Sequence, residues 1–493
     1  MHTPNGLSDL DPTTPERRRL AFDELLASQL ALALARARMR KVKGRTLKGD
    51  GKLRAKALAA LHFTLTKSQT TALAEIFADM AAPERMLRLL QGDVGAGKTL
   101  VAFFAMLNAI ECGAQAALMA PTEVLARQHA AALKPLAEAA GVSLALLTSR
   151  EKGREREVLL DDLSAGTLKI LIGTHALIGE TVVFKDLGLV VVDEQHRFGV
   201  HQRLALSAKG ALPADILVMT ATPIPRTLAL TAYGDMDMSR LTEKPAGRKP
   251  IATRAIPLSR LDEVTDAIER SIAGGERIFW VCPLVEENED LDLTAAQERF
   301  DILQAAFGSA VRLIHGRMKP TEKDEAIGDF RSGKAQILVA TTVIEVGVDV
   351  PDATIIVIEH AERFGLAQLH QLRGRVGRGA KPSTCLLLYQ APLGETARAR
   401  LDCLRTTEDG FVIAEEDLRL RGAGELLGQR QSGEPGFRLA DLEVHRDLVE
   451  PARDDARLIV ARDADLKTPR GEALRTLLYL FEQDDAVKTI KSG

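Results

Sequence analysis

Aromatic residues are scarce in this sequence of 493 residues, and positive charge is not in excess. Aromatics make up 4% of the chain while hydrophobic residues make up 46%, so its cores must be mainly aliphatic. The formal net charge is −3. A positive field over the whole molecule is therefore excluded, and any binding of nucleic acid must depend on local basic patches.

Cysteines and long apolar runs are also few. The four cysteines do not have the spacing of metal ligands, and we expect buried, reduced thiols, as in the cytoplasm: Cys112, Cys282, Cys385 and Cys403. The first apolar run, Leu20 to Leu34, is interrupted by Asp23 and Glu24, unlike a signal peptide. No run reaches the length of a membrane span. These absences predict a cytoplasmic protein with no membrane partner.

The chain length suggests about three domains. Short aliphatic strands alternate with helical segments over residues 61–243 and again over 251–395, which predicts two α/β domains with parallel sheets covered on both faces. Two prolines, a glycine and three cations between Lys244 and Pro250 indicate a linker. Residues 1–60 are predicted to form a tail and a basic linker helix that begins near Pro15, and residues 396–493 a mostly helical, charged segment.

A glycine-rich stretch in the first predicted domain has the spacing G-x-x-x-x-G-K-[ST] of a phosphate-binding P-loop. An apolar strand precedes it and an apolar helix follows, which is the setting that this motif needs. Its backbone N–H groups and the helix N-terminus are expected to bind phosphate oxygens. Lys98 can reach the terminal phosphates, and the Thr99 hydroxyl can ligate Mg²⁺. The residues are Gly92, Asp93, Val94, Gly95, Ala96, Gly97, Lys98 and Thr99.

An acidic pair, Asp193 and Glu194, follows the aliphatic run Leu189 to Val192. This places both side chains at the carboxyl end of a buried strand, where open α/β sheets bind ligands. Asp193 is expected to hold Mg²⁺, and Glu194 to take a proton from a water that attacks the γ-phosphate.

Two arginines of the second predicted domain, Arg375 and Arg378, lie in a Gly- and Arg-rich stretch. They are candidates for arginine fingers, which neutralise charge on a transferring phosphoryl group. An arginine finger supplied by the second domain would make hydrolysis depend on closure of a cleft between the domains. A basic helix with a glycine-rich end is the alternative.

A basic run extends from Arg36 to Lys56. It is either a solvated face, as most charge runs are, or a contact with a phosphate backbone. The sequence favours neither interpretation.

These motifs together resemble the superfamily-two helicases, and within them the RecG family, over roughly residues 17 to 465. The extended acidic motif from Asp193 to Val200, the stretch Thr220 to Thr227 and the stretch Phe63 to Gln69 carry the resemblance, with Asp417 to Gly433 beyond the motor. The resemblance implies two tandem RecA-like domains, with ATP and Mg²⁺ as cofactors.

The resemblance also implies roles for further residues. Gln69 would read adenine, while Gly347 and Asp349 would serve the nucleotide from the second domain. Arg226 belongs to the stretch that resembles the family's coupling motif. Arg419 and Arg421 belong to the stretch that resembles the segment transmitting motor closure to duplex DNA. The residues implied to serve DNA from the two domains are Pro121, Thr122, Thr174, His175, Thr341 and Thr342.

Two departures from the family pattern stand out. Ala423 replaces a frequent proline. RecG proteins also carry an N-terminal wedge domain with an oligonucleotide-binding fold, whereas here only about sixty residues precede the stretch around Gln69. Five strands are needed for such a barrel, so we expect either a fragment or a shortened form. Strand separation and junction specificity are the properties that this departure affects.

The sequence therefore predicts an ATP-dependent double-stranded DNA translocase or helicase, monomeric, that acts on branched DNA in fork regression and junction migration. A transcription-repair coupling translocase is the nearest alternative, although Glu194-Gln195-His196 favours RecG. The motifs also leave open a truncated DNA-binding module without turnover, and an RNA helicase.

Overall fold

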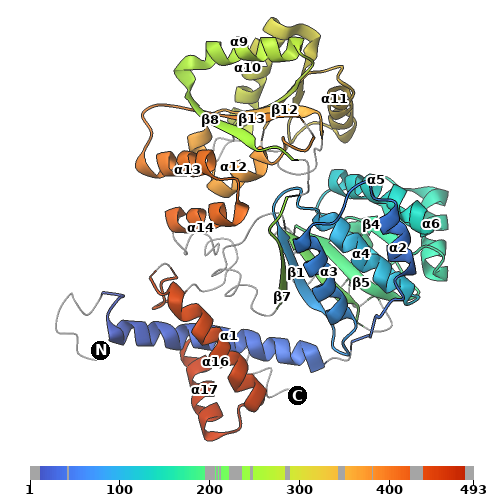
Figure 1. The fold of residues 1–493 in the computed structure, drawn as a ribbon, viewed down its shortest axis with the longest axis vertical. Coiled ribbons are helices and arrows are strands. Elements are labelled where there is room, and N and C mark those ends of the chain that lie inside the picture. Colours follow the sequence, from blue (N-terminus) through green and yellow to red (C-terminus); the bar gives the residue numbers. More distant parts are fainter. Residues whose placement is uncertain are drawn as a thin grey trace.

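The computed structural model describes residues 11–41, 44–194, 206, 209, 213–220, 236–244, 248–283, 289–341, 350–379, 381–421, 437–442 and 444–483. Two separate β-sheets with their helices form two lobes, and a group of long helices lies beside them (Figure 1). The predicted fold class, two parallel-sheet α/β domains with helical flanking segments, is confirmed.

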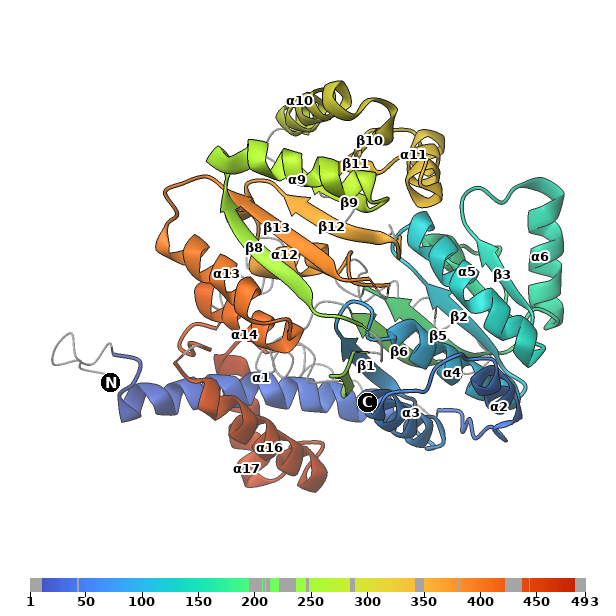
Figure 2. The same ribbon diagram turned by 45° about the horizontal axis from the view of Figure 1, so that its top comes forward.

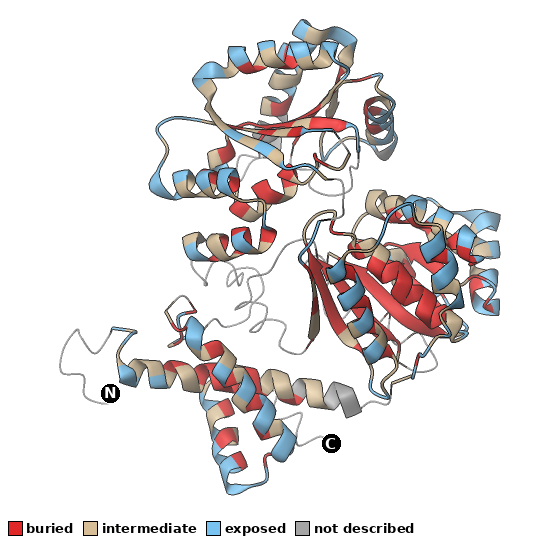
Figure 3. Ribbon diagram, in the orientation of Figure 1, coloured by how far each residue is buried: buried red, intermediate tan, exposed pale blue. Residues whose placement is uncertain are grey.

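The first lobe, residues 44–241 as far as described, contains a seven-stranded sheet in the order β3-β4-β2-β5-β6-β1-β7, with all pairs parallel. Its strands are β1 (Leu87–Gly92), β2 (Gln115–Met119), β3 (Leu144–Leu147), β4 (Ile170–Gly173), β5 (Leu187–Asp193), β6 (Asp215–Thr220) and β7 (Asp237–Leu241). The helices are α2 (Lys52–Ala59), α3 (Lys67–Met80), α4 (Lys98–Glu111), α5 (Glu123–Ala140) and α6 (Gly153–Ala165). The central strands and α4 are almost wholly buried, as continuous apolar runs require (Figure 3).

The second lobe, residues 251–421 as far as described, contains a six-stranded parallel sheet in the order β10-β11-β9-β12-β13-β8. Its strands are β8 (Ile251–Pro257), β9 (Arg277–Val281), β10 (Val311–Ile314), β11 (Ile337–Ala340), β12 (Ala353–Ile358) and β13 (Ser383–Tyr389). The helices are α9 (Leu261–Ala273), α10 (Glu289–Phe307), α11 (Pro320–Ser332), α12 (Leu366–Arg373), α13 (Glu395–Thr406) and α14 (Gly410–Arg421).

Two details of the lobes differ from what the sequence predicts. The strands β7 and β8 are not expected from it, because each lies at a sheet edge and has polar side chains among its apolar ones. The expected domain boundary after residue 395 also divides a hydrophobic core. Leu401, Leu404 and Ile413 of α13 and α14 are buried in the core of the second lobe.

The N-terminal helix and the last helices of the chain form a third body, which we call the helical unit. It consists of α1 (Pro15–Lys41), the segment 437–442, α16 (Arg446–Arg462) and α17 (Pro469–Leu480). Both ribbon views show α1 crossing α16 beside the lobes (Figures 1 and 2). Apolar side chains from these helices share one core, among them Leu25, Leu30, Val449, Ala456 and Leu478.

A buried carboxylate ties the helical unit together. Glu24 of α1 accepts the backbone N–H groups of Arg438, Leu439 and Ala440 at 2.7, 2.8 and 2.7 Å. Three charge-assisted hydrogen bonds compensate the burial of this charge. The N-terminal helix is therefore the structural partner of the C-terminal segment, a contact that the sequence does not predict.

The carboxyl group of Asp215 is buried at the start of β6, 2% exposed, and its Oδ1 accepts the N–H of Met86 at 2.8 Å. Burial raises the pKa of Asp215 from 3.8 to about 7, although the Met86 N–H and Arg85 oppose this rise. Because the pKa is higher in the folded chain, the folded state binds the proton more tightly. The stabilising contribution of protonated Asp215 is therefore complete below about pH 4. It is lost as the pH rises to about 7.

Asp215→Asn should remove this pH dependence, because an amide does not titrate. Its oxygen still accepts the Met86 N–H. We expect the melting temperature of the variant, relative to the unchanged chain, to increase between pH 5 and pH 8. Each unit of pKa displacement corresponds to about 1.4 kcal/mol. Thermal unfolding of both proteins across this pH range tests the prediction, and a constant difference in melting temperature would contradict it.

Candidate nucleotide site and nucleic-acid interface

The P-loop connects β1 to α4, as the sequence predicts. Gly95 and Gly97 have φ angles of 74° and 86°, which side chains with a Cβ rarely adopt. A Cβ on Gly97 would also collide with the side-chain amide of Gln69. Both glycines are therefore required by the path of the loop.

Gln69 holds the P-loop from α3. Its Nε2 donates to the carbonyl O of Ala96 at 2.8 Å, and its Oε1 accepts the N–H of Thr66 at 2.9 Å. Thr66 caps α3 by accepting the N–H of Gln69. In this arrangement the amide supports the loop, and the reading of adenine by Gln69 stays a prediction.

Lys98 is buried at the base of the P-loop, and its Nζ donates to the carbonyl oxygens of Gly92 and Asp93 at 2.8 and 2.9 Å. Burial lowers the pKa of Lys98. The carboxylates of Glu194, Asp193 and Asp93 oppose this effect, and Arg378 adds to it. These four groups are therefore close enough to Lys98 to affect its charge, although they come from both lobes.

The predicted acidic pair lies beside this lysine, because β5 ends at Asp193 next to β6 and one strand from β1. Glu194 has a φ of 52°, in the left-handed region. A glutamate in this conformation is uncommon, and such backbone strain is concentrated at functional sites. The N–H of Glu194 donates to Asp193 Oδ1 at 3.1 Å.

A histidine that sequence reasoning missed connects the P-loop to the acidic pair. His129 of α5 has its Nε2 2.7 Å from Asp193 Oδ2 and its Nδ1 3.4 Å from Thr99 Oγ1. It is 7% exposed. The available signal was a polar residue at a position of the apolar pattern formed by Ala126, Leu133 and Ala137.

The oxygens at this place fit a magnesium ion. The Thr99 hydroxyl and the Asp193 carboxylate both contact His129, and hard oxygen ligands of this kind suit Mg²⁺. Within the described residues no group of three or more His, Cys, Asp or Glu side chains could hold a metal. Mg²⁺ is usually bound by one or two protein ligands together with phosphates and waters.

The arginine-bearing turn of the second lobe packs against the P-loop. A Cβ on Gly374 would lie 2.9 Å from Val94 Cβ, so the two backbones approach closely. Arg378 Nε donates to the carbonyl O of Gly374 at 3.1 Å. Arg375 lies in the same turn, where its N–H donates to Leu372. The structure thus brings Arg378 near Lys98, and the finger role of both arginines stays a prediction.

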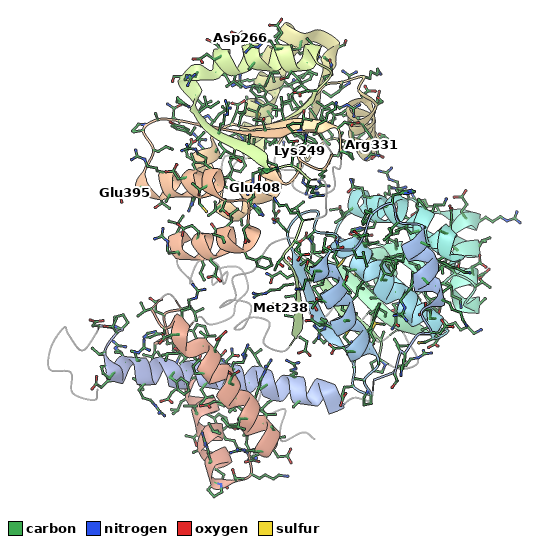
Figure 4. All side chains as sticks on the ribbon, viewed as in Figure 1. Met238, Lys249, Asp266, Arg331, Glu395 and Glu408 are labelled. Carbon is green, nitrogen blue, oxygen red and sulfur yellow. The ribbon has the colours of Figure 1, made fainter. Side chains whose placement is uncertain are left out.

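The linker between the lobes also lies against the P-loop. The Arg248 guanidinium occupies the place where a Gly95 Cβ would stand. Lys244 pairs with Glu408 of the second lobe at 2.6 Å. Figure 4 labels Lys249 and Glu408 between the lobes, and both line one pocket with Asp93 and Val94. Three cations of the linker, Lys244, Arg248 and Lys249, therefore lie beside the P-loop.

Residues predicted to contact DNA lie at the carboxyl ends of neighbouring strands. The Ala120 N–H donates to Gly173 at 2.8 Å, which brings Pro121 and Thr122 next to Thr174 and His175. Thr122 caps α5 by accepting the N–H of Leu125. Thr174 is buried and His175 is exposed. Thr341, which is buried with 3% of its surface exposed, follows β11 in the second lobe.

The remaining predicted residues are less informative. The Arg419 side chain of α14 is 59% exposed and pairs with Glu416 at 2.6 Å. Arg421 ends α14, and its side chain lies outside the described part. Arg226, Thr342, Gly347 and Asp349 also lie outside the described residues, as do most residues of the motif after Glu194.

An ion pair joins the lobes near the predicted DNA contacts. Arg150, after β3, is 2.6 Å from Asp324 of α11 and 3.2 Å from Glu123, the first residue of α5. The lobes therefore touch on this side as well as at the P-loop.

The cations of the basic run from Arg36 to Lys56 fall into two groups in the structure, arginines in ion pairs within the chain and exposed lysines. Arg45 pairs with Asp186, and Arg36 of α1 pairs with Asp237 of β7. Arg54 pairs with the buried Glu111 at 2.9 Å and lies 4.4 Å from the centre of the Phe77 ring. These three arginines hold the chain together, whereas Lys52 and Lys56 of α2 are exposed.

Family comparisons agree with this geometry. The family described as "DEAD/DEAH box helicase" matches residues 66–231, and "Helicase conserved C-terminal domain" matches residues 259–380. A third family, "ATP-dependent DNA helicase RecG, domain 3, C-terminal", matches residues 407–484. The matches thus follow the two lobes and continue into the helical unit. Within the described ranges, no helix has the length and apolar character needed to cross a membrane.

The relatives are equally specific. The ATP-dependent DNA helicases RecG of Escherichia coli K12 and Bacillus subtilis are each 48% identical over 462 residues, which cover 92% and 93% of this chain and 67% of each relative.

A solved structure of RecG bound to a three-way DNA junction aligns with a TM-score of 0.73 and 42% identity, covering 89% of this chain and 57% of that one. Dbp5 of Saccharomyces cerevisiae, bound to RNA and ADP BeF3, aligns at 0.54 and 16% identity over 83% of this chain and 98% of that one, which shows the fold alone. The chain belongs to the RecG family of ATP-dependent DNA helicases.

Proposed function

We propose that this chain is the motor of a RecG-type DNA translocase, which hydrolyses ATP with Mg²⁺ and moves on branched duplex DNA. The observation that carries the proposal is the packing of the Arg378-bearing turn against the P-loop, next to Lys98 and the acidic pair. The identity of nearly half of the aligned residues with RecG proteins supports the DNA substrate.

The roles at the nucleotide follow from the chemistry of phosphoryl transfer. Such a reaction depends mainly on positioning and on electrostatic stabilisation of the phosphoryl oxygens. Lys98 binds the terminal phosphates, and Glu194 orients the attacking water and takes its proton. Thr99 and Asp193 hold Mg²⁺, which neutralises phosphate charge when bound. His129 orients both of these ligands.

Closure of the lobes would complete the site, because Arg378 comes from the second lobe. Both Lys98 and Arg378 are cations, so they repel each other, although Asp193, Glu194 and Asp93 offset part of the charge. A triphosphate removes this repulsion, and its cleavage and release restore it. ATP turnover can in this way alternate the lobes between two placements.

Movement of the lobes would reach DNA through several contacts. Arg150 and Asp324 meet near the predicted DNA-facing strand ends. The helical unit contacts the first lobe through Arg36 and Asp237, and the second through Arg446 and Glu415 at 2.7 Å. Branch migration requires little net energy, because each broken pair, about 1.4 kcal/mol of stacking per step, is replaced by a new one. The motor mainly supplies direction.

A transcription-repair coupling translocase is the nearest alternative. The RecG-specific match over residues 407–484 favours the RecG interpretation. Binding of branched DNA by the whole family member would include parts that this chain does not align with, since it covers 67% of the curated relatives. We therefore assign to this chain the motor, and propose no strand-separating element in it.

ATP hydrolysis should be stimulated by duplex or forked DNA more than by single-stranded DNA or RNA, because the substrate is duplex. Steady-state hydrolysis with each polymer tests this. Lys98→Ala should abolish hydrolysis, and Glu194→Gln should bind ATP without turnover. Equal stimulation by all polymers, or preferential stimulation by RNA, would contradict the assignment. Turnover at the usual rate by Lys98→Ala would contradict the site.

Arg378→Ala should lower kcat by about 10³–10⁵-fold, the range for arginine fingers, with a smaller effect on ATP affinity. The matched control is Arg363→Ala, which removes a half-exposed arginine of the same lobe. Measurement of kcat together with direct nucleotide binding separates the two effects. An unchanged kcat would show that Arg378 is not a finger.

The exposed lysines of α2 offer a test of the basic run. Lys52→Glu with Lys56→Glu should reduce the salt dependence of duplex affinity, by a slope of about 0.9 for each phosphate that these lysines neutralise. Lys134→Glu, an exposed lysine of α5, is the control. If the slope is unchanged, these lysines belong to a solvated surface.

Arg54→Ala should instead lower the free energy of unfolding by about 1.5–3 kcal/mol, because it removes a hydrogen bond to the buried Glu111.

A further inference from the structure

A histidine of the second lobe touches the P-loop of the first. His370 lies in α12, and its Nε2 is 2.7 Å from Asp93 Oδ1. The two side chains are 5% and 15% exposed. Asp93 is the second residue of the P-loop, so this contact joins the lobes at the nucleotide site itself.

The neighbours of His370 determine which ring nitrogen carries the proton. Arg373 Nη2 lies 3.0 Å from His370 Nδ1. A guanidinium has donors only, so Nδ1 must accept this hydrogen bond and the proton is on Nε2. The Nε2–H group then donates to the Asp93 carboxylate. Arg373 therefore orients the ring toward Asp93.

Arg373 is fixed by the end of α13 and the turn that connects it to α14. Its Nη1 donates to the carbonyl oxygens of Leu404 and Thr407 at 2.6 and 2.9 Å. The residue is 2% exposed, so these carbonyl groups replace water as its partners. A continuous chain of hydrogen bonds thus extends from the α13–α14 turn through Arg373 and His370 to Asp93.

Asp93 connects this chain to the phosphate-binding lysine. Its carbonyl O accepts Lys98 Nζ at 2.9 Å, and its carboxylate accepts the N–H of Val94 at 2.7 Å as well as His370. Burial alone would raise the pKa of Asp93, but the hydrogen bond from His370 and the other neighbours hold it below its usual value. The carboxylate therefore stays an acceptor at neutral pH.

We propose that His370 is a positioning residue for ATP hydrolysis, which makes the geometry of the P-loop depend on the placement of the second lobe and of the α13–α14 turn. Hydrogen bonds weaken steeply with distance and angle. A rotation of the second lobe by a few ångströms at this contact therefore removes the donor to Asp93 and changes the surroundings of Lys98. The same turn leads into α14, at the start of the RecG-specific region. The proposal rests on the proposed ATPase function.

The test compares two variants that keep different parts of the ring. The amide nitrogen of Gln can stand near the position of Nε2, whereas the amide of Asn reaches only to the position of Nδ1. His370→Asn should lower DNA-stimulated kcat by about 5–150-fold, the usual range for coupling between sites, with a much smaller change in ATP affinity. His370→Gln should restore most of the rate. Steady-state kinetics and binding of a fluorescent ATP analogue measure the two quantities.

A matched control and a mutant cycle separate positioning from folding. His360 contacts Glu362 at 3.1 Å within the second lobe, so His360→Asn removes a similar pair that does not join the two lobes. Its φ of 49° is tolerated by Asn, and we expect its kcat to equal that of the unchanged chain. Asp93→Ala combined with His370→Asn should be no slower than the more severe single variant, because both remove the same interaction.

Three outcomes would overturn the proposal: an unchanged kcat in His370→Asn, additive effects in the cycle, or equal losses in the Asn and Gln variants together with a lower melting temperature. Failure of the proposed function is distinguishable. It would appear as the absence of DNA stimulation in the unchanged chain, and the effect of His370→Asn on basal kcat would then still decide whether the contact positions the P-loop.

Discussion

The buried charge of Lys98 is the constraint on which the nucleotide site depends. An ammonium group away from water requires nearby oxygens, and the first lobe supplies them as two P-loop carbonyls and the carboxylates of Asp193 and Glu194. The parallel sheet makes this possible, because β1 and β5 end at the same edge. Arg378 adds a second cation from the other lobe. A polyanion bound between the lobes would attract both Lys98 and Arg378, which is a physical reason for a nucleotide to draw the lobes together.

Contacts in the rest of the molecule connect the nucleotide site to the helical unit. The second lobe meets the P-loop through α12, and α13 and α14 share its core. The helical unit touches each lobe by an ion pair, at Asp237 and at Glu415. Leu418 of α14 is also buried in the core of the helical unit, so this unit and the second lobe share an apolar contact. A change in the separation of the lobes would therefore move the helical unit as well.

Much of the fold and part of the site could be predicted from the sequence, because their signals are local. Continuous aliphatic runs between helices predicted the central strands, and the spacing within one loop predicted the P-loop. Residues whose partners are distant in sequence could not be found in this way. His129 meets partners 30 and 64 residues away, and His370 meets Asp93 at a separation of 277. Glu24 binds backbone groups more than 400 residues later. The edge strands β7 and β8 were missed because half-solvated strands lack a continuous apolar run.

The shared core of α1 and α16 also has a consequence for how the chain acquires its structure. The apolar face of α1, with Leu25 and Leu30, is covered by residues from Leu418 onward. During synthesis this face is made long before the residues that cover it, so it must wait for α16 and α17 to emerge. Such late, long-range pairing leaves hydrophobic surface exposed while both lobes fold. A chaperone that shields this face of α1 during synthesis would protect the chain from aggregation.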